Sequence, residues 1–125
     1  MKMPKAIFQH DEDLKILRVR YPGMLTKEEI VAHYNELRTN RSFHRNIRIL
    51  IDCRDSTFTV KPEEVPELTA AAKKAVREYD SVKEAMMVTN PYETVIVILF
   101  EKGINIPNYR FKIFYTEEAA LNWLL

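Results

Sequence analysis

Residues 90–103, NPYETVIVILFEKG, decide which fold this chain can form. The β-branched side chains between Thr94 and Phe100 favour a strand. Four other residues favour a helix instead. They are the cap Asn90, the first-turn proline Pro91, the acid Glu93 three residues after the cap, and the stop signal Gly103. Parallel strands on either side would need a crossover, which is usually helical. We therefore predict a helix, with a strand as the alternative.

The segments on either side of this stretch show alternating strand and helix patterns. Ile47–Ile51 is apolar and β-branched, as expected of a strand that is covered on both faces. A helix follows and begins between Pro62 and Pro66, because proline is tolerated in a first turn. Its predicted buried stripe is Val65, Leu68, Ala72, Ala75, Val76 and Tyr79. Two more strands are predicted, Ala85–Thr89 and Tyr109–Phe114.

The two ends of the chain complete the pattern. Ala6–Phe8 and Leu14–Tyr21 are predicted strands, and the alternation in the second indicates one solvated face. Thr26 and Glu29 form a capping box at the start of a helix, and Thr116 caps a short terminal helix. The order is β-β-α-β-α-β-α-β-α. It predicts an α/β fold, in which residues 1–125 form a single domain with a mixed, mostly parallel five-stranded sheet and four helices.

Length, charge and cysteine content exclude several classes of protein. The 125 residues carry a formal net charge of only +1, so no general field attracts nucleic acid or anionic membrane. Cys53 is the only cysteine, which excludes an intrachain disulfide and favours a reducing compartment. Met1–Ala6 is not followed by the apolar run of a signal peptide. The longest apolar run, Val95–Phe100, is far shorter than the roughly 20 residues that span a bilayer. We expect a cytoplasmic protein without a transmembrane segment.

Three groups of short motifs occur in order along the chain. They are Pro22-Gly23 with Leu25-Thr26-x-Glu28-Glu29, then Ile49-Leu50-Ile51-Asp52, then Phe114-x-Thr116-Glu117-Glu118-Ala119 with Trp123-Leu124. With the element order and the length, they resemble the SpoIIAA-like family, which is related to the STAS domains of anti-sigma-factor antagonists and anion transporters. The resemblance implies a small bacterial cytoplasmic domain that binds protein partners and has no chemistry of its own. The family also resembles the lipid-binding SEC14 class in layout.

The resemblance further implies a phosphorylated serine at the start of the helix after the central strand. When Phe58 is matched to the aromatic residue usual in that loop, the acceptor position falls at Val60-Lys61-Pro62-Glu63. Lys61, Pro62 and Glu63 carry no hydroxyl group. The usual serine phosphoswitch is therefore not expected in this chain.

Four polar residues follow the central strand, where open α/β sheets place ligands. They are Asp52, Asp55, Ser56 and Thr57. One interpretation is a polar binding loop in which Ser56 or Thr57 is a displaced phosphoacceptor. The other is ordinary turn chemistry, in which such side chains bond to their own backbone, and we favour this second interpretation.

No residue pattern supports catalysis, a metal, a cofactor or nucleic-acid binding. His10, His33 and His44 are far apart in sequence, and Glu29 with His33 is interpreted as a surface pair on one helix. Cys53 is interpreted as a structural residue, with a nucleophile at Cys53 or His44 as the weaker alternative. A basic stretch is interpreted as solvated rather than as a contact for an acidic protein, a phosphate or RNA. It consists of Arg38, Arg41, Arg45, Arg48 and Arg54.

The apolar helix supplies the main functional hypothesis. Apolar side chains surround its axis, and one contact with a sheet cannot cover all of them. The candidate face is Tyr92, Val95, Ile96, Leu99 and Phe100. The leading hypothesis is a non-enzymatic protein-interaction or regulatory module that binds a protein partner or associates with itself as a homodimer. The alternative is a carrier or sensor of a lipid or other apolar small molecule, in which this helix lines a pocket.

Overall fold

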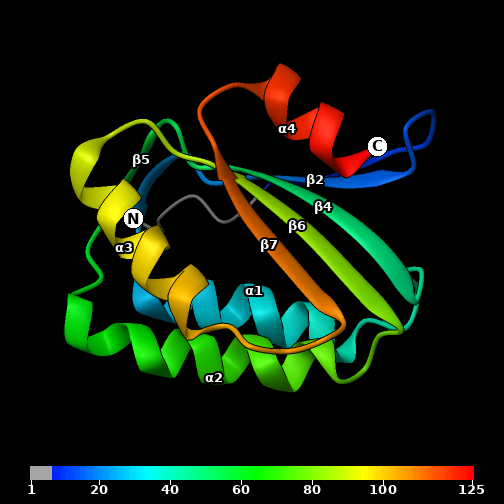
Figure 1. Cartoon of the computed structure of the whole chain (residues 1–125), viewed down its shortest axis with the longest axis horizontal. Coiled ribbons are helices and arrows are strands. Elements are labelled where there is room, and N and C mark those ends of the chain that lie inside the picture. The colour runs from blue at the N-terminus through cyan, green and yellow to red at the C-terminus, as the bar shows by residue number, and fades with distance from the viewer. Residues whose placement is uncertain (1–6) are drawn as a thin grey trace.

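The computed structural model describes residues 7–125 and confirms the predicted α/β architecture (Figure 1). The main sheet has five strands in the order β1-β2-β4-β6-β7. β1 is antiparallel to β2, and the other neighbours are parallel. The five strands are Ile7–Asp11, Ile16–Arg20, Asn46–Asp52, Ser81–Met87 and Tyr109–Phe114. Met1–Ala6, and with it the first residue of the predicted strand Ala6–Phe8, lies outside the described residues.

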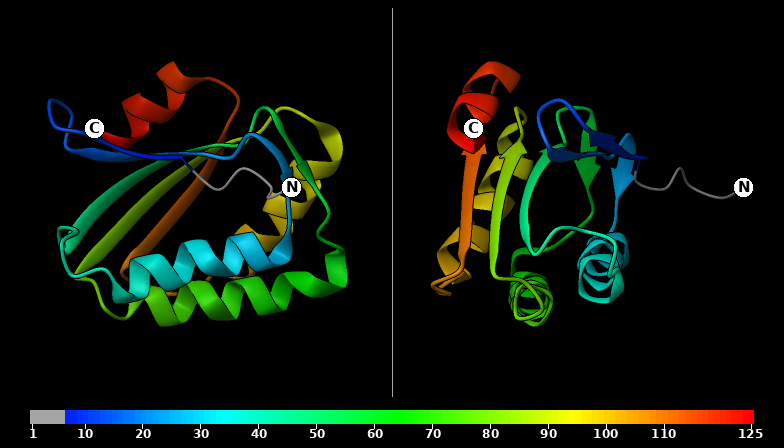
Figure 2. Two further views of the ribbon diagram at one scale, coloured as in Figure 1. Left: turned by 180° about the vertical axis from the view of Figure 1, so that it is seen from behind. Right: turned by 90° about the vertical axis from the view of Figure 1, so that its right-hand side faces the viewer.

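Four α-helices cover the two faces of the sheet. They are α1 (Lys27–Thr39), α2 (Val65–Val76), α3 (Pro91–Gly103) and α4 (Glu117–Leu124), and the short 3₁₀ helix η1 (Pro62–Glu64) precedes α2. Figure 2 shows α1 and α2 side by side on one face and α4 on the other. α3 packs against α2 and β7 on the same side as α1 and α2.

The decisive stretch forms a helix, as predicted, and provides the crossover between the parallel strands β6 and β7. Asn90 is the N-cap residue and Pro91 occupies the first turn. The side chain of Asn90 makes no capping hydrogen bond. Glu93 does not complete a capping box either, because its carboxylate accepts the backbone N–H of Phe58 at 3.0 Å. The helix was therefore predicted correctly, but Glu93, one of its expected start signals, bonds to Phe58 instead of capping the helix.

A second, two-stranded sheet was not predicted. It pairs β3 (Gly23–Leu25) in parallel with β5 (Ser56–Phe58). Each strand has only three residues, too few to show a period of two in the sequence. Gly23, with φ of 80°, provides the left-handed conformation that starts the first of them.

The predicted position of β6 needs a correction. The strand begins at Ser81 rather than Ala85, and it ends at Met87 rather than Thr89. Lys83 and Glu84 are charged, so the start of the strand lacks the apolar run that is typical of a buried strand. Pairing with β4 along seven residues holds these charged positions in the sheet.

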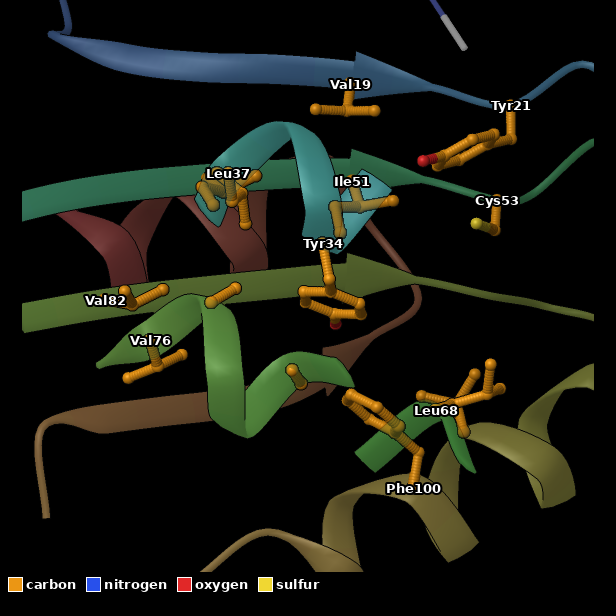
Figure 3. Close-up of a cluster of buried hydrophobic side chains, with 14 of the residues drawn as sticks. Val19, Tyr21, Tyr34, Leu37, Ile51, Cys53, Leu68, Val76, Val82 and Phe100 are labelled. Atoms are coloured by element: carbon orange, nitrogen blue, oxygen red, sulfur yellow. The ribbon is translucent and has the colours of Figure 1, made fainter. Parts of the chain in front are cut away.

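Buried side chains form two clusters, one on each face of the sheet. The larger cluster lies between the sheet and α1, α2 and α3, and Figure 3 shows Tyr34, Leu37, Leu68 and Phe100 within it. The smaller cluster joins the sheet to α4 and consists of Ile16, Leu50, Ala85, Met87, Ala120 and Leu124. Because α4 has only eight residues, it covers only part of its face.

Candidate functional site

The predicted apolar face of α3 divides into an exposed part and a buried part. Tyr92, Val95 and Leu99 are 46%, 52% and 38% exposed, whereas Ile96 and Phe100 are 2% and 5% exposed. Ile98, which was not among the candidates, is 37% exposed. We call the four exposed residues Tyr92, Val95, Ile98 and Leu99 the outer α3 face. Ile96 and Phe100 belong to the core instead.

Three contacts fix α3 against its neighbours. The Glu93 carboxylate accepts the N–H of Phe58 in β5, and the Tyr92 hydroxyl donates to the carbonyl of Val60 at 2.5 Å. At the other end, a Cβ atom on Gly103 would lie 2.8 Å from Cγ2 of Thr69 in α2, so the two helices approach closely there. The outer α3 face is thus held in place at both ends of the helix.

The four polar residues after the central strand do not converge on one site. The Asp52 carboxylate accepts hydrogen bonds from the Arg54 guanidinium at 3.0 and 2.9 Å. Burial acts to raise the pKa of Asp52, but the hydrogen bonds from Arg54 outweigh it and the pKa lies below its ordinary value. Asp55 and Thr57 are exposed.

Ser56 requires a correction, because it lies, together with Thr57, in β5 and not in a loop. Its side chain is buried, and its hydroxyl donates to the carbonyl of Tyr21 at 2.5 Å. The hydroxyl is therefore committed to holding the end of β2 against β5. Thr57 is the hydroxyl residue of this segment that points outward.

A buried carboxylate cluster lies beneath α1 and was not predicted. Glu84 of β6 is 0% exposed, and its Oε1 accepts hydrogen bonds from the hydroxyls of Tyr34 at 2.8 Å and Tyr109 at 2.5 Å. Its Oε2 lies 3.2 Å from Nε2 of His33. The prediction that Glu29 and His33 form a surface pair is wrong, because His33 is buried and Glu29 completes the capping box with Thr26.

Burial controls the protonation of the two tyrosines. Burial, and then the neighbouring charge of Glu84, raise the pKa values of Tyr34 and Tyr109 well above the ordinary value. Both hydroxyl groups therefore stay protonated and can donate to the carboxylate. The cluster is a set of donors around one acceptor group, as a buried carboxylate requires.

A small cavity of about 30 Å³ adjoins this cluster, between the sheet, α1 and α3. Its walls include Tyr21, His33 and Tyr34 together with Ile96 and Phe100 of α3. Within residues 7–125, the Tyr21 hydroxyl and Nδ1 of His33 are buried and have no hydrogen-bond partner. Figure 3 shows the Tyr21 ring pointing into this region. The cavity is thus mostly apolar, but two of its wall residues carry unsatisfied polar atoms.

Cys53 has the surroundings of a structural residue. Its side chain is buried, and burial raises the pKa of the thiol to about 12. A thiol that is protonated at neutral pH is a poor nucleophile, so the burial of Cys53 disfavours its alternative interpretation as a nucleophile. The described residues contain no group of three or more His, Cys, Asp or Glu side chains that could hold a metal ion.

Among the helices of residues 7–125, none is long and apolar enough to cross a membrane.

Two solved structures share this architecture. One is an uncharacterised protein of the DUF3478 family with a SpoIIAA-like fold from Shewanella loihica PV-4, with a TM-score of 0.60 and 19% identity over 96% of this chain and 92% of that chain. The other is an anti-sigma-factor antagonist (STAS) domain protein from Planctomyces limnophilus, with a TM-score of 0.60 and 15% identity over 97% of this chain and 98% of that chain. At these identities the likeness shows the fold alone.

No match was found among curated proteins. A family model does match, and it covers nearly the whole chain, including the sheet from β2 onward and all four α-helices. The model is SpoIIAA-like, and it matches residues 16–125. The chain belongs to the SpoIIAA-like family.

Proposed function

We propose that this protein is a non-enzymatic, regulatory protein-binding module of the STAS type, and that its outer α3 face contacts the partner. One observation carries the proposal. Of the eight exposed large apolar side chains among the described residues, four lie on α3, and they are Tyr92, Val95, Ile98 and Leu99. Within residues 7–125, the other helices carry no such residue between their bounds. A cluster of exposed apolar side chains is typical of protein interaction sites.

The rest of the chain is consistent with binding rather than catalysis. The thiol of Cys53 is buried and its pKa is raised to about 12. The segment at the family's phosphoacceptor position, residues 60–63, has no hydroxyl at Lys61, Pro62 or Glu63. We therefore propose that binding is not switched by phosphorylation at that position.

Charge introduced on the outer α3 face tests the proposal. The variant carries Val95→Glu and Leu99→Glu, and Tyr115→Glu is the matched control because Tyr115 is 65% exposed in the turn before α4. Native mass spectrometry and sedimentation velocity of protein purified from its own cells report the subunit count and any bound partner. We expect the double variant to weaken association at least about tenfold, since buried apolar anchors dominate interface energies. The control should associate like the unmodified protein.

If every association survives both charge changes, the proposal is wrong. An unmodified protein that is monomeric and without a bound protein would also contradict it.

A second function, a carrier of an apolar small molecule, is favoured by a separate observation. The cavity beneath α3 has apolar walls and adjoins two polar atoms without partners, the Tyr21 hydroxyl and Nδ1 of His33. A cavity of about 30 Å³ accommodates little more than a water molecule, so a larger ligand requires α3 to move outward. The same native spectra decide between the two functions. A stoichiometric small mass that is lost on denaturation supports the carrier, and an empty protein bound to a partner supports the module.

A further inference from the structure

Three cations lie side by side on the sheet face that carries α4. Arg48 of β4 is in register with Lys83 of β6, which is in register with Arg110 of β7. Neighbouring strands are about 4.8 Å apart, and side chains in register point to the same face, so the row spans about 10 Å. We call Arg48, Lys83 and Arg110 the cation row.

In the part of the chain that the structure describes, no acid compensates the charge of the cation row. No carboxylate among residues 7–125 lies within 4.0 Å of the charged nitrogens of its three members. Arg18, on the same face, shows the usual arrangement, because it pairs with Asp11 and Glu117 at 3.2 Å each. Partial burial, and then the charges of Arg110 and Arg48, lower the pKa of Lys83. Like charges in register destabilise a sheet, so an anion bound along the row would relieve the repulsion among its members.

The cation row opens into a groove of about 640 Å³ at the amino ends of the strands. Among residues 7–125, no Asp or Glu side chain lines the groove. Besides the row, its walls carry the polar or basic side chains of Lys15, His44, Arg45, Asn46, Ser81 and Asn108, and Leu125, the last residue, also lies in the wall. The C-terminal end of α4, at Leu124, closes one side. Figure 1 shows that the starts of β4 and β6 extend beyond α4. The groove is therefore a concave basic site on a chain whose net charge is only +1.

We propose that this groove binds a small molecule that carries two or more linked phosphate groups. The planar guanidinium groups of Arg48 and Arg110 suit phosphate oxygens, and Lys83 supplies a point charge between them. The volume is in the range of small-molecule sites. The site lies on the opposite face of the sheet from the outer α3 face, so it goes beyond the function proposed above.

A nucleic acid fits this surface less well. Single-stranded nucleic acids bind where aromatic rings offer free faces to successive bases. Trp123 is the aromatic residue beside the row, and its ring is already covered by Lys83 at 4.7 Å and Arg110 at 5.9 Å. The Lys83 ammonium also donates to the backbone carbonyl of Trp123. The ring therefore holds the cations in place and is not free to stack on a base.

Calorimetric titration of the full chain with tripolyphosphate tests the proposal. We expect one molecule bound per chain, and pyrophosphate and inorganic phosphate should bind progressively more weakly. Arg48→Gln and Lys83→Met should each weaken tripolyphosphate binding at least about tenfold, because each removes a charge-assisted contact. Lys74→Met is the matched control, since Lys74 is exposed on α2 on the other side of the sheet, and it should leave the affinity unchanged. Leu99→Glu should also leave the affinity for tripolyphosphate unchanged. This result would show that the groove binds independently of the outer α3 face.

Several outcomes would overturn the proposal. One is the absence of tripolyphosphate binding at low salt. Another is an equal loss of affinity with Lys74→Met, which would show that binding follows general charge. Tighter binding of an oligoglutamate peptide or of single-stranded RNA, with the same dependence on Arg48, would assign the groove to those partners. Circular dichroism and the melting temperature check that each variant is folded, so that weak binding is not mistaken for unfolding.

Discussion

A carboxylate in the centre of a sheet loses its hydration and needs hydrogen-bond donors from the protein. Glu84 has three such neighbours, since Tyr34 and Tyr109 donate to one oxygen and His33 lies beside the other. These residues come from α1, β6 and β7, so one side chain connects three elements through the core. The cost of placing a carboxylate there is offset only while every donor is present.

Replacement of Glu84 by leucine tests this dependence at the level of one residue. The hydroxyls of Tyr34 and Tyr109 lose their shared acceptor, and because they lie 3.2 Å apart, only one of them can donate to the other. One buried donor is left unsatisfied, so Glu84→Leu should lower the free energy of unfolding by about 3 kcal/mol. Addition of Tyr34→Phe and Tyr109→Phe should recover much of the loss, because it removes both hydroxyl groups. Urea unfolding followed by circular dichroism measures each variant.

Glu118→Leu is the control for Glu84→Leu, because Glu118 is exposed on α4. It should change the free energy of unfolding by no more than about 0.5 kcal/mol. If Glu84→Leu is equally mild, Glu84 does not connect the core in the way described.

The sequence did not reveal this cluster, for reasons specific to its members. Glu84 fell outside the strand predicted at Ala85–Thr89, since a charged residue breaks an apolar run. His33 stands four residues after Glu29, a spacing that suggests a surface pair, but the helix turns its ring into the core. Partners 50 and 51 residues apart leave no local pattern. The contacts of Glu84 follow from the pairing of the strands, which the sequence does not show.

At the scale of elements, α3 shows which sequence signals can be trusted. The first-turn proline, the stop at Gly103 and the need for a crossover outweighed seven residues of strand propensity, since tertiary context often overrides propensity. The capping box at Thr26 and the cap at Thr116 were equally dependable. The three-residue strands β3 and β5 gave no periodic signal, and with them the position of Ser56 was missed.

The close approach of α3 to α2 gives a prediction for this pair of helices. Gly103→Ala places a Cβ atom 2.8 Å from Cγ2 of Thr69, which is buried and β-branched. One helix must shift, so the variant should lose about 1–2 kcal/mol of unfolding free energy, although alanine favours a helix. Thr69→Ser removes that methyl group and can keep the hydroxyl bond to the Pro66 carbonyl.

Thermal and urea unfolding of the two single variants and the double variant form a thermodynamic cycle. The double variant should be close in stability to Thr69→Ser alone. A Gly103→Ala protein as stable as the unmodified one would mean that α3 does not approach α2 this closely.

At the scale of the whole molecule, the two faces of the sheet have opposite character. One face carries three helices, the larger buried cluster and the outer α3 face. The other carries the short α4, whose eight residues leave the amino ends of β4, β6 and β7 uncovered. The sequence predicted the number and order of these elements. It could not show that Arg48, Lys83 and Arg110 meet, because residues 62 positions apart become neighbours only through the register.

The cation row should reduce the stability of the free protein in a way that depends on salt. Arg48 makes no ion pair among the described residues, so Arg48→Gln removes repulsion from Lys83 at little cost in contacts. At low ionic strength the variant should be more stable by about 0.5 kcal/mol. At 1 M salt the screening length is only about 3 Å, and the difference should vanish.

Urea midpoints measured at both salt concentrations check this, with Lys74→Met as the control that should show neither effect. A gain that persists unchanged at high salt would point to packing or strand propensity at position 48, and the three cations would then not repel one another across the sheet.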